Sequence, residues 1–411
     1  MKILFIHQNF PGQYKHLAPL LAARGHECTA LTLRVKESMT WRGVRVLPYR
    51  LPRRAAQKVH PWLIDLDTKV TRAQACFEAA RDLRERGFAP DLILAHPGWG
   101  ESLFLHDVWP RARIGLYCEL HYHADYPNLD FDPEFAAPDP ESQALRMRMK
   151  NINNHLHFAF ADAGISPTRF QAETFPAEFR KRITICHDGI DTAAARPDPE
   201  ARFALGEQRL TRADEVITFV NRNLEPLRGY HIFMRALPRL LAERPKARVV
   251  IVGGDGVSYG APPPEGKSWK QVFIDEVRGQ IPDRDWARVH FTGRIPYARF
   301  LTLLQVSRVH VYLTCPFVLG WSLLEAMSCG AAVVASDTAP VREVIRDGET
   351  GRLVDFFDRE ALVGAVCALL DEPRTRDALG RAARRHVTRS HDLRTVCLPA
   401  QLDWIDRLTE A

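Results

Sequence analysis

The stretch VITFVNRNLEPLRG, residues 216–229, decides the fold of the second half of the chain. Its first five residues are mostly apolar and β-branched, which predicts a buried strand. A helical pattern follows over residues 230–244. A strand that passes through a short loop into a helix is half of a crossover unit, so the stretch indicates a mostly parallel α/β sheet.

Two arginines, Arg222 and Arg228, lie in the loop between this strand and this helix. Guanidinium groups present planar donors that match phosphate oxygens, and a helix N-terminus adds oriented N–H groups. The loop is therefore a candidate clamp for a diphosphate. Spacing alone leaves the alternative open that both arginines are ordinary solvated surface residues.

The alternation of strands and helices continues on both sides of this stretch. Crossover connections between the strands predict two doubly wound, Rossmann-like α/β domains, with a Pro-rich hinge near residues 190–199. The expected strands are residues 2–7, 27–33, 44–49, 91–95, 113–120, 164–166 and 183–186 in the first half, and 216–220, 248–252, 289–291, 309–313, 332–336 and 351–354 in the second.

Length and composition agree with a folded, multidomain chain. The 411 residues are 46% hydrophobic and 26% charged, values typical of globular proteins, which argues against disordered or fibrous classes. No apolar run reaches 18 residues, and the start does not resemble a signal peptide, so we expect a cytoplasmic protein. The eight cysteines form no CxxC pair and indicate neither a zinc site nor a disulfide framework.

A second informative stretch is FVLGWSLLEAMSCG, residues 317–330, which joins a strand to a helix. Gly320 would let a ligand approach the backbone closely. Glu325 would lie one turn into the helix, where a carboxylate can accept hydrogen bonds from ribose hydroxyls. The alternative for Glu325 is a helix-start acid favoured by the helix dipole.

The order of these motifs resembles that of the family-4 retaining glycosyltransferases, also called group 1, which have the GT-B fold. The resemblance rests on Arg222 with Arg228, the helix of Glu325, and EVIRDGETG at residues 343–351. It extends to HQNFPGQYKHLAPLLAARGHE at residues 7–27, which is similar to one bacterial subgroup, and to CHDGID at residues 186–191.

The resemblance implies two Rossmann-like domains that face a central cleft. Residues 1–190 would be the acceptor-binding domain, and residues 191–391 would bind the nucleotide-sugar donor. Residues 392–411 would cross back to the first domain. Leu402, Trp404, Ile405 and Leu408 have helical spacing, and the apolar face that they form needs such a partner.

The resemblance also implies roles for single residues in the second domain. Arg222 and Arg228 match the basic pair that holds the donor diphosphate, and Glu325 matches the glutamate that contacts the ribose. The family's other glutamate would fall at Phe317 and is absent here. Further donor-binding residues implied in this way are Leu319, Gly320, Trp321 and Ser322 toward the sugar, Gly293 and Arg294 toward the nucleobase, and Gly12 near the donor phosphate.

The first domain needs a group near the anomeric carbon. His121, at the end of the strand 113–120, matches the place of the family's active-site histidine, which makes it a catalytic candidate together with Arg222, Arg228 and Glu325. Glu119 and His123 compete with it, and His96 is another candidate in the cleft. For each histidine the alternative is a structural role in which the ring bonds to a backbone carbonyl.

No metal site and no cofactor are expected. Asp65-Leu66-Asp67 and Asp130-Phe131-Asp132 look like an Asp-x-Asp metal motif, but that motif should end a strand beside a nucleotide site. Asp67 is expected to cap a helix, and Asp130 lies in a Pro-rich loop, so we interpret these residues as surface acids.

The formal net charge of +6 suits anionic small molecules or a lipid surface and is too small to indicate nucleic-acid binding. Basic clusters occur at residues 50–58, 146–150 and 180–182 of the first domain. We interpret them as solvated surface, with docking of this domain on anionic lipid at the inner face of a membrane as the alternative.

The sequence thus predicts a retaining, metal-independent glycosyltransferase. It would transfer a hexose-type sugar from a nucleotide-diphosphate sugar to a glycan, a lipid-linked acceptor or a small molecule, with cell-envelope or exopolysaccharide synthesis favoured. Phe317 motivates one alternative, a binding or scaffold protein on a catalytically decayed fold. Another is a nucleotide-sugar epimerase of the same fold, which acts without an acceptor.

Overall fold

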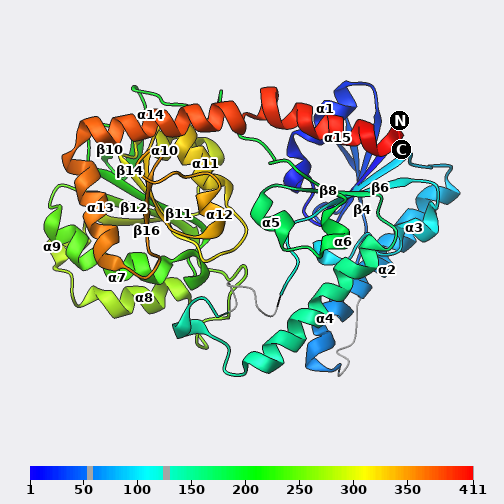
Figure 1. Ribbon diagram of the computed structural model, residues 1–411, viewed down its shortest axis with the longest axis horizontal. Helices are drawn as coiled ribbons and strands as arrows, with labels where there is room; N and C mark the ends of the chain where they lie inside the picture. The colour runs from blue at the N-terminus through cyan, green and yellow to red at the C-terminus, as the bar shows by residue number, and fades with distance from the viewer. Residues whose placement is uncertain (53–58, 124–129, 411) are drawn as a thin grey trace. The chain divides into compact units, whose positions relative to one another are not determined.

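A computed structural model describes residues 1–52, 59–123 and 130–410, and they form two compact units (Figure 1). The first unit holds residues 1–129, 137–188 and 397–411, and the second holds residues 130–136 and 189–396. Three boundaries differ from those predicted. The main division lies between residues 188 and 189 instead of 190 and 191, and the returning segment starts at residue 397 instead of 392. Residues 130–136 belong to the second unit because their side chains pack there.

The first unit is built on an eight-stranded sheet in the order β3-β4-β2-β1-β5-β6-β7-β8. All pairings are parallel except β3 with β4. Because β1 pairs with β2 on one side and β5 on the other, the topological switch point lies between β1 and β5. The strands are β1 (Lys2–Ile6), β2 (Glu27–Thr32), β3 (Met39–Trp41), β4 (Val44–Pro48), β5 (Leu92–Ala95), β6 (Arg113–Tyr117), β7 (Ala163–Ser166) and β8 (Ile183–Ile185).

Helices cover the sheet of the first unit and enclose two apolar clusters. The final helix belongs to this unit. A Cβ at Gly115 of β6 would lie 2.6 Å from the ring of Trp404, so only glycine lets this helix pack so close to the strand. The helices are α1 (Leu17–Ala23), α2 (Ile64–Glu85), α3 (Leu105–Val108), α4 (Pro140–Phe158), α5 (Arg169–Glu173), α6 (Ala177–Arg180) and α15 (Leu398–Glu410).

The predicted helix cap at Asp67 is wrong. The helix α2 begins at Ile64, after a short 3₁₀ turn, Pro61–Leu63, that His60 caps by accepting the N–H of Trp62. Asp67 therefore lies inside the first turn of the helix, where a carboxylate is favoured by the helix dipole.

The second unit has a six-stranded parallel sheet in the order β13-β12-β11-β14-β15-β16, which is the doubly wound arrangement that the sequence predicts. Its switch point lies between β11 and β14. A separate hairpin, β9 (Phe203–Leu205) with β10 (Gln208–Leu210), was not predicted. The sheet strands are β11 (Val216–Asn223), β12 (Arg248–Gly254), β13 (Val289–Gly293), β14 (Val309–Tyr312), β15 (Ala332–Ser336) and β16 (Arg352–Val354).

Apolar clusters also fill both faces of this second sheet. Its helices are α7 (Tyr230–Glu243), α8 (Trp269–Arg278), α9 (Asp283–Trp286), α10 (Tyr297–Val306), α11 (Trp321–Ser328), α12 (Ala339–Arg342), α13 (Arg359–Asp371) and α14 (Pro373–Ser390). Among the helices that the structure describes in either unit, none combines the length and apolar character that crossing a bilayer requires.

Candidate functional site

In the second unit, the predicted site residues gather at the switch point of the sheet. The strand β11 runs three residues further than predicted, so that Arg222 lies inside it and only Arg228 lies in the loop that follows. The chain leaves the neighbouring β14 through the loop 313–320. Because the two strands are parallel, both exits lie at the same edge of the sheet. Ligands of doubly wound sheets bind at this edge.

Arg228 is held firmly at this edge. Its Nη1 donates to Thr314 Oγ1 at 2.8 Å and to the carbonyl oxygen of Val318 at 2.9 Å. Both acceptors belong to the loop after β14, so the half-buried guanidinium joins the two exits. One nitrogen is thereby occupied, and the direction of the group is fixed, which is the preorganisation that recognition of a phosphate requires.

The turn before α7 explains how Arg228 reaches this position. Gly229 has φ +67°, in the left-handed region that favours glycine, and its N–H donates to Pro226 O at 2.7 Å. A Cβ at this residue would lie 2.3 Å from Leu313 Cβ, so any other residue would push the two loops apart. Arg222, in contrast, is exposed near the end of β11.

Phe317 lies beside Arg228 and is 4% exposed. Its ring centroid is 5.4 Å from the Arg228 guanidinium carbon and 4.9 Å from the ring of Tyr259. The guanidinium also lies 6.0 Å from the Tyr259 ring. An aromatic pair therefore packs beside the arginine, a geometry that stabilises the cation through the ring quadrupoles.

The loop that ends in Gly320 leads directly into α11. The Gly320 N–H donates to the Tyr312 hydroxyl at 2.8 Å, which fixes the start of the helix. Leu319 is buried, whereas Gly320, Trp321 and Ser322 are partly exposed, so the backbone around them can meet a ligand.

Glu325 is 6% exposed, and its Oε1 accepts the Tyr297 hydroxyl at 2.7 Å. Burial and the neighbouring carboxylate both raise the pKa of Tyr297, so this hydroxyl stays protonated and keeps donating. One carboxylate oxygen of Glu325, the residue expected to bind the ribose, is therefore already bound to Tyr297. The sequence analysis missed this tyrosine.

β13 ends at Gly293, and Arg294 follows it, at the same edge of the sheet. Gly293 has φ +63°, and Arg294 donates from Nη2 to Asn223 Oδ1 at 2.8 Å. Asn223 in turn donates to Ser258 Oγ at 2.7 Å. Asn223 therefore connects the ends of β11 and β13. The sequence analysis missed Asn223, although its place between Arg222 and Arg228 in the chain could have indicated it.

Glu225 is a further residue that the sequence analysis missed. It is 1% exposed, and its Oε2 accepts the N–H groups of Ser258 at 3.1 Å and of Tyr259 at 3.4 Å. It thereby holds the loop that carries Tyr259 against Phe317. The carboxylate acts inside the protein and supports the aromatic pair beside Arg228.

The switch point of the first unit carries histidines. His7 follows β1, and its Nε2 lies 2.7 Å from Gln13 Oε1, while its Nδ1 accepts the N–H of Asn9 at 3.0 Å. Gly12 has φ +45°, and a Cβ there would lie 2.3 Å from His7 Nε2. Gly12, which was predicted to lie near a donor phosphate, thus leaves space for the imidazole of His7. The sequence analysis counted His7 as the last residue of a strand.

His96 follows β5 and lies 5.5 Å from His7, measured between ring centroids. Its ring stacks on Trp99 at 4.3 Å, and its Nδ1 accepts the N–H of Gly98 at 3.1 Å. The proton therefore resides on Nε2, which has no hydrogen-bond partner among residues 1–52, 59–123 and 130–410. The nearest carboxylate oxygen, Glu119 Oε2, is 3.7 Å from it.

Burial keeps these two histidines neutral. It lowers the pKa of His7 to about 4, although the hydrogen bond with Gln13 opposes the shift. Burial also holds the pKa of His96 well below its usual range, with His7 adding to the effect. Both rings can therefore donate or accept a hydrogen bond at neutral pH, but they do not supply positive charge.

His121 lies in a different group of rings. Its imidazole packs against His123 at 4.9 Å, His155 at 5.4 Å and Phe175 at 5.7 Å. Burial, followed by the charges of His123 and His155, lowers its pKa to about 3. Both ring nitrogens lack hydrogen-bond partners within the described part of the chain, whereas His123 Nε2 bonds to the backbone oxygen of Thr174. The structure thus brings His96 and Glu119 together and places His121 with His123.

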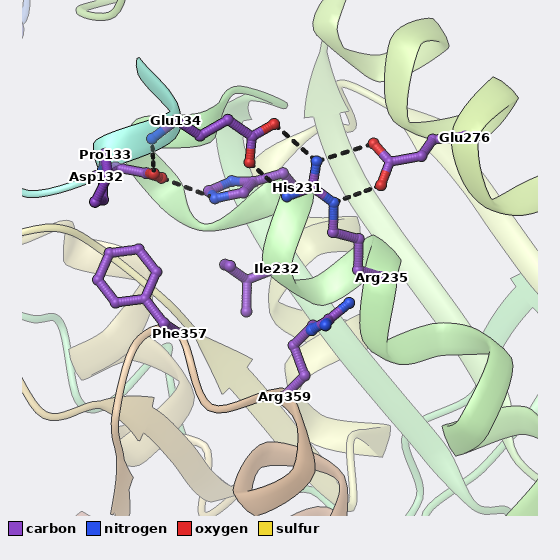
Figure 2. A pocket seen from close by; sticks show the side chains of 9 residues that line it. All are labelled: Asp132, Pro133, Glu134, His231, Ile232, Arg235, Glu276, Phe357 and Arg359. Atoms are coloured by element: carbon purple, nitrogen blue, oxygen red, sulfur yellow. Dashed lines mark hydrogen bonds and ion pairs between the residues drawn. The ribbon is translucent and has the colours of Figure 1, made fainter. Parts of the chain in front are cut away.

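A cavity of about 420 Å³ opens in the second unit where residues 130–136 pack on it (Figure 2). Glu134 forms two bonds with Arg235, at 2.6 and 2.8 Å, and Asp132 Oδ2 lies 2.9 Å from His231 Nε2. Phe135 packs against Trp269 with ring centroids 5.3 Å apart. Charged and aromatic contacts therefore anchor this short segment on α7 and α8.

This arrangement corrects the interpretation of Asp132 as a simple surface acid, because its carboxylate pairs with the buried ring of His231. Asp132, Glu134 and His231 place possible ligand atoms within 4.8 Å of one another. Arg235 already neutralises Glu134, however, and Figure 2 shows its guanidinium between Glu134 and Glu276. The group is therefore better suited to anchoring the segment than to holding a cation.

Some residues of the basic clusters in the first unit make contacts within the fold. The ammonium of Lys150 lies 3.8 Å from the centre of the Tyr122 ring, and Arg182 donates to the carbonyl oxygens of Phe158 and Ala161. Arg146 and Arg148 are exposed. The cluster at residues 50–58 lies largely outside the described residues.

Two family models match the chain, one over each half. The model described as "Glycosyl transferase family 4 group" matches residues 24–195, and "Glycosyl transferases group 1" matches residues 204–386. The second match contains Arg222, Arg228, Gly293, Arg294 and Glu325. Together the two matches span most of the sequence.

Curated relatives are similar over a large part of the chain. A D-inositol 3-phosphate glycosyltransferase of Acidothermus cellulolyticus is 32% identical over 72% of this chain and 65% of its own length. A GDP-mannose-dependent alpha-(1-6)-phosphatidylinositol monomannoside mannosyltransferase of Mycolicibacterium smegmatis is 29% identical over 54% of this chain and 57% of its own. The chain thus spans less than two thirds of the length of these relatives. A glycogen synthase of Mycobacterium tuberculosis is 28% identical over 96% of this chain and 92% of its own.

Solved structures have a similar fold. The sucrose-phosphate synthase of Thermosynechococcus elongatus superposes with a TM-score of 0.75 at 18% identity, over the full length of both chains. The HepE protein of Anabaena, solved with UDP and glucose, superposes with a TM-score of 0.67 at 17% identity, also over both full chains. At these identities the likeness concerns the fold.

Proposed function

We propose, from the premise that this chain belongs to the group 1 glycosyltransferases of family 4 and has their GT-B fold, that it transfers a hexose-type sugar from a nucleotide-diphosphate sugar with retention at the anomeric carbon. Metal-independent chemistry and a glycan, lipid-linked or small-molecule acceptor complete the proposal. The observation that carries it is the fixed guanidinium of Arg228 at the switch point of the second sheet.

The role proposed for Arg228 follows from where charge develops. As the bond between the sugar and the diphosphate breaks, the leaving oxygens gain negative charge, and the sugar becomes oxocarbenium-like. A guanidinium already held by Thr314 and Val318 stabilises that charge without reorganising. Arg222, exposed near the end of β11, adds a second cation in this proposal, so a metal ion is not required.

The groups at the first unit's switch point suit a neutral partner. Uncharged His96 and the half-buried Glu119 can orient sugar hydroxyls, and Trp99 offers a ring against which a sugar face can pack. We therefore assign acceptor binding to this unit and donor binding to the second. We assign no nucleophile to the other face of the sugar and therefore propose substitution on one face.

The names of the relatives support the class of donor and acceptor. One relative uses GDP-mannose and acts on a phosphatidylinositol mannoside, and HepE was solved with UDP and glucose. Both are consistent with a nucleotide-diphosphate donor here. Because the two nucleobases differ, the proposal names the diphosphate sugar as a class.

A screen of nucleotide-diphosphate sugars tests the proposal. A ligand present at 100 times its dissociation constant should raise the free energy of unfolding by about 2.7 kcal/mol, which is visible as a shift in Tm. The donor so identified is then supplied with its sugar labelled, and the products are separated. Label in a glycan or lipid product with retained anomeric configuration supports transfer.

Other product patterns would contradict the proposal. Epimerised or hydrolysed donor, with no dependence on an acceptor, would point to the nucleotide-sugar epimerase. Donor binding without turnover would point to a catalytically decayed binding protein. The absence of the family's glutamate at Phe317 suggests this alternative.

A further inference from the structure

The long helix α14 of the second unit carries an arginine row on its exposed face. Its opposite face packs into the unit through Leu379, Ala383 and Val387. Arg381, Arg385 and Arg389 follow one another at intervals of four residues, and Arg374 lies two helical turns before them. All four are exposed, and together they form a row of charge about 22 Å long on one face of the helix.

This row lacks the partners that other arginines of the unit have. Arg235 pairs with Glu134 and Glu276, and on α14 itself Arg376 pairs with Asp377. No carboxylate of the described chain lies within ion-pair distance of Arg374, Arg381, Arg385 or Arg389. Like charges four residues apart on a helix repel, so the row is an unfavourable arrangement for the isolated protein.

A neighbouring histidine senses the positive charge of the row. Burial lowers the pKa of His386, and the charges of Arg389 and Arg346 lower it further, so the ring adds no charge of its own. Arg384, next to Arg385, is itself fixed by donating to the carbonyl oxygens of Ala195 and Ser328. The helix is thereby pinned to the unit, and the row presents its charges on a rigid support.

We infer that the arginine row of α14 is a docking surface for an anionic lipid bilayer. A bilayer offers many phosphates in one plane, which several guanidiniums on one face of a fixed helix can meet at once. The exposed face carries no Phe, Tyr or Trp between residues 373 and 390, so it lacks the stacking platform that single-stranded nucleic acid would use. The inference goes beyond the proposed function and does not depend on it.

Co-flotation with lipid vesicles tests the inference. The full chain is mixed with vesicles of phosphatidylcholine alone or of phosphatidylcholine with phosphatidylglycerol. Binding should need phosphatidylglycerol and should weaken as salt is added. In a variant that combines Arg381→Gln, Arg385→Gln and Arg389→Gln, each lost charge should weaken binding about fivefold, or about a hundredfold together. Glutamine is a good helix former, so α14 should persist.

A matched variant in the first unit is the control. Arg146→Gln with Arg148→Gln removes exposed charge from the helix α4, and its vesicle binding should stay as in the parent protein. Donor-induced shifts in Tm should be equal in all three proteins, because none of the changes touches the site. Binding that is lost in the control instead, or that ignores lipid charge, would overturn the inference. Tighter binding to a duplex DNA fragment than to vesicles, abolished by the same α14 changes, would do so as well.

Discussion

The switch points of the two sheets occupy the same place in similar topologies, yet they carry different chemistry. In the first unit, β1 and β5 end in His7 and His96, whose rings are buried and neutral. In the second, β11 and β14 enclose Arg228, which is half-buried and permanently charged. Topology therefore places the two candidate sites alike, whereas the residues that follow the strands give them different charge.

The difference also concerns how each group is held. Arg228 is fixed by Thr314 and Val318, so its donors already point in one direction. His96 is fixed by its stack on Trp99 and by the N–H of Gly98, and its Nε2 remains without a partner in the described chain. We therefore expect ligand binding by the second unit to depend on the charge of Arg228. Ligand binding by the first unit should depend on the neutrality of its histidine rings.

The largest effect is expected for Arg228→Ala. Loss of a preorganised donor at the leaving group should lower kcat/KM by about 10²–10³-fold, as measured by steady-state kinetics with varied donor. Arg228→Lys keeps the charge but loses the fork, so it should recover only part of the rate. Arg222→Ala should have the smaller effect because that side chain is exposed. A folded Arg228→Ala protein with unchanged donor kinetics would show that the charge resides elsewhere.

The second prediction concerns acid. The folded pKa of His7, about 4, lies below the unfolded value near 6.5, so the unfolded chain binds more protons between these two pH values. Its contribution to stability is therefore complete above pH 6.5 and is lost as pH falls toward 4. At about 1.4 kcal/mol per pKa unit, this amounts to about 3 kcal/mol.

Urea unfolding at a series of pH values measures this contribution. In His7→Gln, the slope of unfolding free energy against pH should become shallower over this window, by up to about 1.4 kcal/mol per pH unit. Arg222→Gln, at the other switch point, should leave the slope unchanged. Equal slopes in the parent protein and His7→Gln would mean that the ring of His7 is not kept neutral by burial.

Much of this architecture could be predicted from the sequence. Long apolar runs and the glycine-closed loops located both main sheets, and Arg228 stood out because it follows a strand. Arg222 was expected in the same loop but lies inside β11, which is longer than predicted. The hairpin of β9 and β10 was missed because strands of three residues are too short to show a period. The pairs Asp132 with His231 and Tyr297 with Glu325 were missed because packing joins residues that are distant in sequence.

His7 shows a different limit. It closes an apolar run, and a histidine in that place is equally consistent with the end of a strand. Only the left-handed turn at Gly12 and the contact with Gln13 reveal that the ring faces the loop. Likewise, nothing local distinguishes His96 from His121. Their different neighbours come from the order of β1, β5 and β6 in the sheet.

The third prediction tests the aromatic contact of Arg228. Phe317 is 4% exposed and lies beside the Arg228 guanidinium. Phe317→Glu places a carboxylate at this buried position, where the two charges should pair. We expect a loss of about 1–3 kcal/mol in unfolding free energy from incomplete satisfaction of the buried group. The KM for the donor should rise because Arg228 is partly neutralised. Phe317→Leu, which keeps an apolar side chain, should affect stability alone. Unchanged stability and an unchanged donor profile in Phe317→Glu would place the side chain elsewhere.

The smallest expected effect is that of chelation, which should leave kcat unchanged. If Arg222 and Arg228 supply the positive charge for the departing diphosphate, removing divalent ions with EDTA takes nothing from the transition state. Activity that disappears with EDTA and returns with magnesium or manganese would contradict this. His231→Gln then locates the ion, since His231, Asp132 and Glu134 form a group with suitable spacing in the described chain. An unchanged metal requirement in His231→Gln shows that the ion binds outside this group, and it refutes the proposal that the two arginines suffice. A need for much more metal, or a loss of activity, in His231→Gln places the ion at residues 130–136, where Arg235 would have to release Glu134 to admit it.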